Sequence, residues 1–323
     1  MLVSELQAMT DDYIENRQPL DVYFKSNVLL YKLLNKGDTY DGGKKIQSNL
    51  EYGKSNSGSY GPTTEFPIAK TDILTAAYFT YAAYYATLTA DMEDELVNSG
   101  DAQIVDIVMT KLKNAEKTLR DTMAAAVFGA RADGILTDAK SKPLLGLKDL
   151  FNQSDGFAYG EILPTDLVRA DATGMWKTGS ISSGVMGFKF MQELRRSASI
   201  DTTLEGKPDL YLTTEVLQDA YERSQQVQVR YSDKTLLNAG FDNVLFKGAA
   251  VVADNKQATG YIDALNMRYL KMKTHSKRNF TKPVWQSPIR QPETKTANIR
   301  WVGQFICSNR EAHARATGIT EPE

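Results

Sequence analysis

The chain has 323 residues, of which 42% are hydrophobic and 24% charged, and its formal net charge at neutral pH is −2. This composition is typical of a globular protein and excludes general disorder, a collagen-like chain and a coiled-coil rod. One cysteine and two histidines exclude an internal disulfide framework and leave few ligands for zinc. Residues 1–20 carry acids and no apolar core segment, so we expect no signal peptide and a soluble, intracellular protein.

The first segment, residues 2–36, predicts two short amphipathic helices separated near Pro19. Apolar residues recur at spacings of three and four on both sides of the proline, and the second helix is expected to stop at Gly37. Helices this short have no core of their own. We therefore expect this N-terminal arm to pack on another surface.

The next segment predicts a long two-stranded hairpin. Asp41-Gly42-Gly43 is a turn signal, and the alternation from Ile46 to Tyr52 is typical of a half-exposed strand. Ten residues rich in Gly and Ser, from Gly53 to Pro62, follow it. We expect the return strand at Glu65–Ile68, restricted to a sheet edge by its proline. Such a hairpin is marginal in isolation and needs a partner surface.

Alternating alanines and aromatics from Ile73 to Ala90 favour a strand over a helix. Four tyrosines and four threonines make the segment too polar for a membrane span. The aromatics could instead form a base-stacking platform for single-stranded nucleic acid, but no basic residue falls between Asp72 and Asp91. Core packing is the favoured interpretation.

The strongest signal predicts one continuous helix over residues 101–128. Its apolar stripe recurs at spacings of three and four, and Gly129 ends it. The stripe consists of Ile104, Val108, Leu112, Ala115, Leu119, Met123 and Val127. A helix of this span would be about 42 Å long at about 1.5 Å per residue, which exceeds the usual helix of a compact globule. We therefore expect an elongated body.

From residue 183 the pattern becomes a mixture of short helices and strands, after a loop-rich stretch over 130–180. From Met267 the chain is expected to be mostly extended. The individual expectations are a helix at 185–196, a strand at 209–212, a helix opened by Thr213-Thr214-Glu215, strands at 244–246 and 250–252, and a terminal strand at 299–306.

The residues that could carry catalysis are few. His275 and His313 are expected on the surface, and Cys307, after two apolar residues in a predicted strand, is expected to be a buried inert thiol. The acidic run Asp91–Glu95 is interpreted as a solvated approach to the long helix. No phosphate loop, dinucleotide fingerprint or metal motif occurs, so we expect no enzyme activity and no cofactor.

A basic segment lies near the end of the chain. Residues 266–315 hold eleven Lys and Arg against two Glu, so the remainder of the chain is acidic. Such a segment can be a solvated face, a nucleic-acid surface or a contact for acids of another subunit. We expect several of these cations to pair with acids of the same or an adjacent subunit, such as the Asp91–Glu95 run, and DNA contact to be weak.

The order of these elements resembles the major capsid proteins of tailed bacteriophages, with their Hong Kong 97-like fold. Each motif is weak alone, and the ordered set spans nearly the whole chain. The motifs are Asp41-Gly42-Gly43 before a strand ending Leu50-Glu51-Tyr52, Asn98-Ser99-Gly100 before the helix, the run Lys113–Asp121 with Val127-Phe128-Gly129, Leu145-Gly146-Leu147, Tyr159-Gly160, Trp176, and Ile299–Gln304.

The resemblance implies an α+β subunit whose hairpin, the extension loop, lies over a neighbour. It implies subunit contacts for Gly42, Gly43, Tyr52, Lys54 and Tyr60, and a spine-helix core of Ile104, Val108, Leu112 and Leu119. The implied parts are an N-terminal arm (1–40), the extension loop (41–72), a peripheral domain (73–179) with the spine helix (101–128), an axial α/β domain (180–262), and a return to the peripheral domain with a C-terminal tail (263–323).

The function that the resemblance implies is a shell protein. It would self-assemble through hexamers and pentamers into an icosahedral phage head around double-stranded DNA, in the host cytoplasm, with portal and scaffold or decoration proteins as partners. A Lys–Asn cross-link between subunits occurs in some relatives, but no motif marks Lys44, Lys45 or Lys54 as reactive. Two alternatives stay open: an encapsulin-like shell around an enzyme cargo, and an unrecognised α/β enzyme with a titratable pocket.

Overall fold

A computed structural model of the chain describes residues 27–68, 70, 72–91, 101–134, 141–167, 174–201, 203–225, 243–281, 284–287 and 294–322. For residues 101–110 it describes the helical backbone and not the side chains. The first expected helix of the arm, the caps at 98–100 and nearly all of the acidic run Asp91–Glu95 lie outside these residues.

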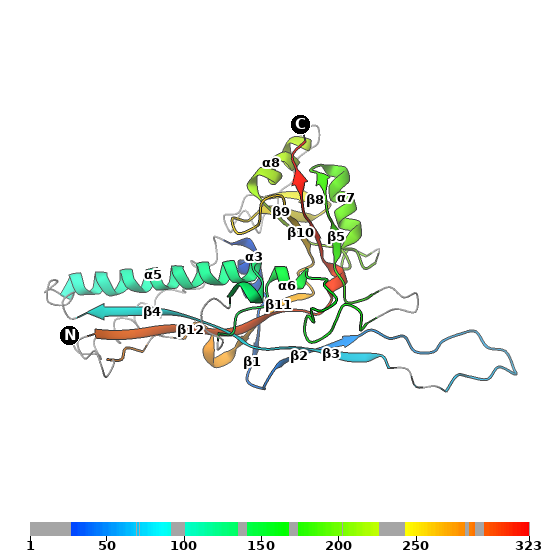
Figure 1. Cartoon of the computed structure of the whole chain (residues 1–323), viewed down its shortest axis with the longest axis horizontal. Coiled ribbons are helices and arrows are strands. Elements are labelled where there is room, and N and C mark those ends of the chain that lie inside the picture. The colour runs from blue at the N-terminus through cyan, green and yellow to red at the C-terminus, as the bar shows by residue number, and fades with distance from the viewer. Residues whose placement is uncertain are drawn as a thin grey trace.

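The molecule has three parts that extend in different directions (Figure 1). A long helix and two long strands run one way, a unit of short helices and strands rises above them, and a two-stranded hairpin ends in a thin loop on the opposite side. The expected elongated body is confirmed.

The long part is a four-stranded sheet with one long helix, α5, beside it. The helix spans Asp101–Phe128, as the sequence predicts. In the described part of its apolar stripe, Leu112, Leu119 and Met123 are at most 2% exposed, because they pack against the sheet. The side chains of Ile104 and Val108 lie outside the described residues. The strand order is β1 (Asp38–Tyr40), β11 (Leu270–His275), β12 (Thr294–Cys307) and β4 (Ala82–Asp91).

The hairpin pairs β2 (Ile46–Glu51) with β3 (Leu74–Phe79). The expected return strand at Glu65–Ile68 is wrong, since these residues lie in the exposed loop. Pro67 has no N–H to give a ladder, whereas Ala77 and Phe79 of β3 are fully buried in the core. Burial therefore makes β3, and not Glu65–Ile68, the partner of β2, and the loop between the two strands is longer than expected.

The aromatic segment is extended, as predicted, but it is divided between two sheets. It leaves the hairpin after Phe79 and enters β4 at Ala82. Along β4 the side chains of Ala86, Leu88 and Ala90 are buried and those of Tyr85, Thr87 and Thr89 are exposed, so one face of the sheet packs on the core and the other does not. Among the described residues, no helix is long and apolar enough to cross a bilayer.

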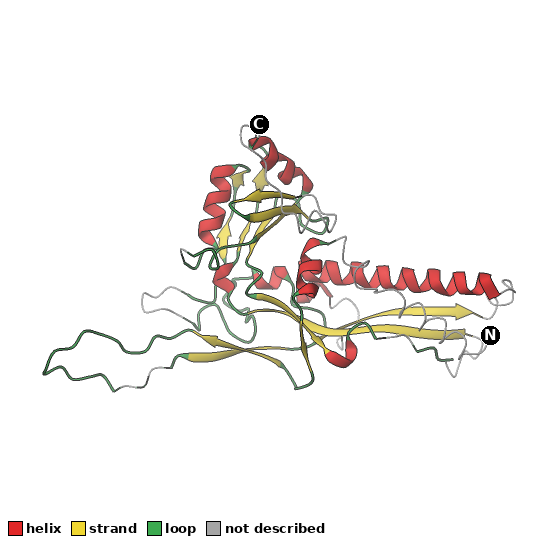
Figure 2. Cartoon of the chain, turned by 180° about the vertical axis from the view of Figure 1, so that it is seen from behind, coloured by secondary structure: helices red, strands yellow, loops and turns green. Residues whose placement is uncertain are grey.

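The upper unit is a six-stranded sheet with helices α7 (Phe188–Ser197) and α8 (Glu215–Ser224) packed on it (Figure 2). It has its own hydrophobic cluster, which includes Met191, Leu194, Leu217 and Tyr221. The strand order is β5 (Gly179–Ile181), β13 (Ala314–Ala316), β10 (Ile262–Leu265), β7 (Leu210–Thr213), β9 (Ala249–Ala253) and β8 (Asn243–Phe246).

The end of the described chain differs from the expected boundary. The expectation that residues 263–323 return to the lower part holds for β11 and β12, but β13 lies between β5 and β10 in the upper sheet. The next strand, β14 (Ile319–Thr320), pairs with β6 (Gly184–Val185). Short, alanine-rich strands carry little periodicity, so only their pairing shows where they belong.

The second helix of the arm, α3 (Val28–Asn35), is not coreless. Leu29, Leu30 and Leu33 are fully buried in the main hydrophobic cluster of the same subunit, and Asn27 caps the helix by accepting from the Leu30 N–H. The surface on which this part of the arm packs is therefore the core of its own subunit, and it does not require a neighbouring one. Shorter helical turns are α6 (Leu147–Leu150), η1 (Arg131–Gly134), η2 (Ser276–Arg278) and η3 (Arg310–Ala312).

Candidate subunit interface

The extension loop is closed at its root, where the two strands still touch. The N–H groups of Tyr52 and Gly53 donate to the Ile73 carbonyl at 3.0 and 3.3 Å. A Cβ on Gly53 would lie 2.5 Å from the Asp72 carbonyl oxygen, so only glycine fits this approach. Beyond this root the loop has no strand partner among the described residues.

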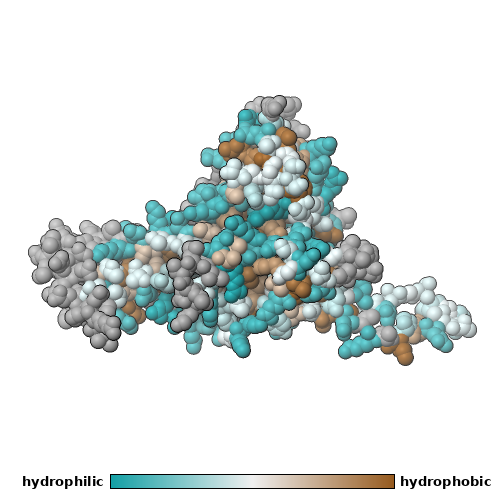
Figure 3. Space-filling view, viewed as in Figure 1, coloured by the Kyte–Doolittle hydropathy of each residue, from teal (hydrophilic) through white to brown (hydrophobic). Residues whose placement is uncertain are grey.

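The tip of the loop carries apolar side chains in water. Tyr60 is 74% exposed, Phe66 66% and Ile68 99%. A turn between Gly61 and Thr64, closed by N–H···O bonds of 2.8 and 3.1 Å, brings the Tyr60 and Phe66 rings to 5.5 Å. Figure 3 shows brown, apolar patches along this thin loop, away from the body. A projecting apolar surface of this kind is typical of an interaction site.

The base of the hairpin is tied to its own subunit. The Tyr78 N–H donates to the Gly160 carbonyl at 2.9 Å, Lys45 forms an ion pair with Glu161, and the Tyr81 hydroxyl donates to the Gly43 carbonyl. Gly43 has φ +108°, a conformation that disfavours other residues. The hairpin therefore holds its direction at the base, and the tip is its free end.

The predicted contact residues fall into two groups. Gly42 and Gly43 shape the turn into β2, and Tyr52 packs partly buried against the core of its own subunit. Lys54 and Tyr60 lie exposed on the loop, where another molecule can reach them. A role of all five in subunit contact stays a prediction.

A buried arginine holds the junction between the lower and upper parts. Arg310 is 0% exposed, and its guanidinium donates to the carbonyls of Leu150 (3.1 and 2.7 Å), Trp176 (2.9 Å) and Asn152 (2.6 Å). It also lies 5.2 Å from the centre of the Tyr159 ring. Backbone carbonyls thus replace water around this cation, and the loops before β5 are fixed to the chain before β13.

His313 is buried beside this junction, so the expectation of a surface histidine is wrong. Its Nδ1 accepts from the Asn266 N–H at 3.2 Å, and burial, together with Arg310, lowers its pKa to about 3. His275, also expected on the surface, is half-buried against the Tyr40 ring. Cys307 is fully buried as predicted, and burial raises its pKa to about 12.

A second junction joins the turn after β9 to α3 and α5. The Asn27 side chain donates to Asp254 at 2.9 Å, and Lys256 lies 3.3 Å from Asp121 on α5. Burial raises the pKa of Asp254 to about 6. No local signal marks Asp254 or Arg310 in the sequence, because their partners lie more than a hundred residues away.

Several cations of the basic segment pair within the subunit, as expected. Arg315 forms two bonds, of 2.6 and 2.7 Å, with the buried Asp263, which faces it across β10 and β13. Lys271 donates to Asp38 at 2.9 Å, and Arg268 pairs with Glu205. Pairing with the Asp91–Glu95 run lies outside the described residues.

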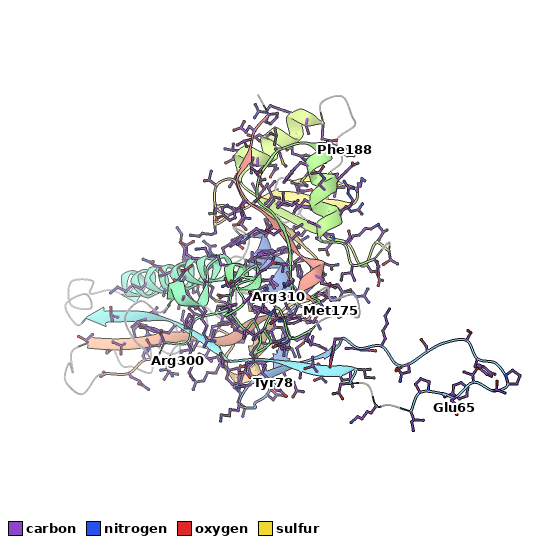
Figure 4. The ribbon with its side chains drawn as sticks, turned by 45° about the vertical axis from the view of Figure 1, so that its right-hand side comes forward. Glu65, Tyr78, Met175, Phe188, Arg300 and Arg310 are labelled. Atoms are coloured by element: carbon purple, nitrogen blue, oxygen red, sulfur yellow. The ribbon has the colours of Figure 1, made fainter. Side chains whose placement is uncertain are left out.

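The upper unit also exposes apolar side chains, of which Phe188 lies near its outer end (Figure 4). Phe188 is 39% exposed, Val185 55% and Val216 54%. The Lys247 ammonium lies 5.8 Å from the Phe188 ring centre and extends the same surface. Within the described residues, no three His, Cys, Asp or Glu side chains gather where they could hold a metal ion.

A long helix beside a long sheet, a second α/β unit and a projecting hairpin together define the Hong Kong 97-like capsid fold, and comparison with solved structures supports this assignment. A chain of the cyanophage A-1(L) capsid asymmetric unit superposes with a TM-score of 0.66 at 13% identity, covering 92% of this chain and 93% of that one. The capsid of Myoviridae phage XM1 gives 0.55 at 10% identity, covering 89% and 91%.

The SrpI encapsulin of Synechococcus elongatus has the same fold, with a TM-score of 0.54 at 8% identity over 90% of this chain and 89% of that one. No protein-family model matches the sequence, and no curated protein matches it either. The chain therefore has the capsid fold, and the likeness lies in its structure.

Proposed function

We propose that this protein is the major shell subunit of a tailed-phage head. It assembles through hexamers and pentamers into an icosahedral shell around double-stranded DNA. The observation that carries the proposal is the loop tip, where Tyr60, Phe66 and Ile68 project into water on a base that is tied down. In a monomer these side chains stay in contact with water, which is unfavourable. A neighbour that covers the tip removes their apolar surface from water.

The upper unit supports the same proposal. Its exposed Phe188 lies far from both the helix α5 and the loop (Figure 4), and Val185 and Val216 of the same unit are exposed as well. Two apolar surfaces in different directions on one chain permit head-to-tail contacts, which close into rings when the rotation allows it. We place the axial domain here, at the centre of a ring, and the peripheral domain around α5.

The test is assembly of the purified protein, alone and with the other head proteins of its source. Sedimentation velocity combined with negative-stain microscopy is expected to show capsomers or closed shells of uniform diameter. A single monomer boundary at every concentration, with and without the other head proteins, would refute the proposal.

An encapsulin-like shell is the second candidate, and the superposition on the SrpI encapsulin favours it. The two candidates differ in what the particle encloses. Shells purified from the source are expected to protect double-stranded DNA from nuclease; a protein cargo and no protected DNA would favour the encapsulin-like alternative. Portal, scaffold and decoration proteins, and assembly in the host cytoplasm, belong to the phage-head proposal.

Non-enzymatic action is part of the same proposal. Cys307 is buried with a raised pKa, and His313 is buried and held neutral, so neither is available to a substrate. The proteins with similar structures are shell proteins as well.

A further inference from the structure

Helix α3 is the place where the N-terminal arm enters the core, at the junction between the lower and upper parts (Figure 1). Its N-cap, Asn27, is 2% exposed and makes hydrogen bonds in two directions. The side-chain oxygen accepts from the Leu30 N–H at 2.8 Å, and the side-chain nitrogen donates to Asp254 at 2.9 Å. One asparagine therefore joins the root of the arm to the turn after β9. We name this pair of residues, Asn27 and Asp254, the arm contact.

Asp254 is a buried carboxyl group without a direct ion pair among the described residues. It is 4% exposed, and besides Asn27 it accepts from the Lys256 N–H at 3.1 Å. Lys256 is the charged residue that acts on it, but the Lys256 ammonium lies 3.3 Å from Asp121 of α5. A carboxyl group that is removed from water and meets only amide and N–H donors holds its proton more tightly than one in solution.

The direction of the resulting pH dependence follows from this environment. From α3 the N–H groups of Val28 and Leu29 favour the charged form of Asp254, but burial outweighs them and raises its pKa to about 6 from an ordinary 3.8. The closed contact therefore binds a proton more tightly than an open one. Its stability is greatest below about pH 3.8 and declines as the pH rises to about 6, so the ionised carboxylate weakens the contact at neutral pH.

The two sides of the arm contact are not equally held. The turn that carries Asp254 is fixed to the upper sheet, because the Asp254 N–H donates to the Thr213 carbonyl of β7 at 2.9 Å and Gln257 donates to the buried Asp263 at 2.9 Å. The other side is the first turn of a helix, whose leading N–H groups have no partner within the helix. A helix end opens more readily than a strand inside a sheet, so opening should begin in α3.

We infer that Asp254 makes the arm contact a proton-sensitive switch: its protonated form holds the first turn of α3 closed, and its ionised form lets that turn open more often. The switch sets how firmly the arm is attached to the upper unit at a given pH. It is a property of the single subunit, so it does not depend on the proposed shell function.

The test is hydrogen–deuterium exchange of the unassembled full-length subunit at pH 5 and pH 7, read by mass spectrometry. The measured quantity is the protection factor of peptides from α3, which corrects for the intrinsic pH dependence of exchange. Opening of α3 is expected to be about tenfold more frequent at pH 7 than at pH 5, as linkage through pKa values of 3.8 and about 6 requires. Peptides from α7 are the internal reference and should show no such change.

Three variants assign the effect to this site. Asp254→Asn keeps an oxygen that accepts from Asn27 but cannot ionise, so at pH 7 it should protect α3 as wild type does at pH 5. Asp121→Asn frees the Lys256 ammonium to approach Asp254, which should move the transition to lower pH, a shift that a merely structural role would not produce. Asp133→Asn, which removes an exposed pair with Lys148, is the matched control and should leave the profile unchanged.

Two results would overturn the inference. The first is equal protection of α3 in wild type at both pH values. The second is faster opening in Asp254→Asn than in wild type at pH 7, since it would mean that the ionised carboxylate holds the helix closed. If Asp254→Asn does not fold, the comparison of wild type with Asp121→Asn decides, and identical pH profiles of these two proteins refute the switch.

Discussion

At the scale of single residues, buried polar groups hold the two parts of the subunit together. Arg310 has no carboxylate partner among the described residues and depends on backbone carbonyls from two loops. Removing a buried cation of this kind leaves those carbonyls without donors, which costs more than the bonds themselves contribute.

Arg310→Ala is expected to lower the free energy of unfolding by at least about 3 kcal/mol, since the carbonyls of Leu150, Asn152 and Trp176 lose this donor and a buried group left unsatisfied costs about 1–3 kcal/mol. Urea titration of the unassembled subunit measures this change. Arg268→Ala, which removes an exposed pair with Glu205, is the control and should cost less than about 1 kcal/mol. Equal losses in both variants would mean that the junction opens to water.

His313 is expected to make the stability of the subunit depend on pH. Its pKa is lowered in the folded state to about 3 from an ordinary 6.5, so the folded subunit binds fewer protons than the unfolded chain between those values. Its contribution is therefore complete above pH 6.5 and is lost as the pH falls toward 3. Between pH 7 and 5 it should remove about 2 kcal/mol of stability.

The measurement compares urea midpoints at pH 7 and pH 5 for wild type and His313→Asn, whose amide oxygen can still accept from Asn266. The difference between the two proteins isolates this residue, because other groups titrate in both. Asp254 acts in the opposite direction: its raised pKa, about 6, means that its contribution falls as the pH rises from about 3.8 to 6. An identical pH dependence in both proteins would show that His313 is solvated.

At the scale of elements, the long helix could be predicted to the residue and the hairpin only in part. The helix has a continuous apolar stripe, and a local period needs no knowledge of distant partners. Leu74–Phe79 could be predicted as extended, but its pairing with β2 could not, because burial of Ala77 and Phe79 under other elements selects it as the partner. Burial of α3, His313 and Arg310 depends on segments far away in the chain, so the sequence pattern does not show it.

The apolar stripe of α5 predicts which face of the helix is buried, and substitutions on the two faces test this prediction. Leu112 is 1% exposed, so Leu112→Ala should cost about 2–5 kcal/mol in a denaturant titration. Lys117 is exposed on the same helix, and Lys117→Ala should cost well under about 1 kcal/mol. Similar losses would mean that the helix packs through another face.

The extension loop is expected to be open to proteases in the unassembled subunit and covered in the assembled shell. Lys54 and Lys70 are exposed on either side of the tip, and an exposed loop without strand pairing is a preferred site of proteolysis. Trypsin is expected to cut unassembled subunits near Lys54 first, and assembled shells much more slowly. Equal rates in both states would contradict a loop that is covered by a neighbour.

At the scale of the whole molecule, the contact surfaces could be predicted only in outline. The sequence indicates an exposed Gly- and Ser-rich loop with Tyr60, but the exposed surface around Arg300 and Tyr85 depends on the pairing of β12 with β4, in which Thr87 and Asn298, 211 residues apart, face each other. Arg278 and Arg300 belong to a basic run whose other members, such as Lys271 and Arg315, are paired within the subunit. Only the structure separates the paired cations from the unpaired ones.

This pairing predicts weak binding to DNA. Since Arg268, Lys271 and Arg315 of the basic segment are paired with acids of the same subunit, unassembled subunits should bind duplex DNA without sequence preference and lose most of that affinity between about 50 and 200 mM salt. Fluorescence anisotropy with a labelled duplex measures it. Tight binding at the higher salt, abolished by Arg300→Glu while shells remain intact, would make the segment a nucleic-acid surface instead.

The place of β13 in the upper sheet has a consequence for synthesis on the ribosome. This strand lies between β5 and β10, so a growing chain cannot close the sheet until residues 314–316 have emerged. By then α5, the extension loop and both long strands have already been made. A nascent chain therefore exposes its apolar loop tip before its upper sheet is closed, and we expect contacts made through that sheet to form only after residues 314–316 have emerged.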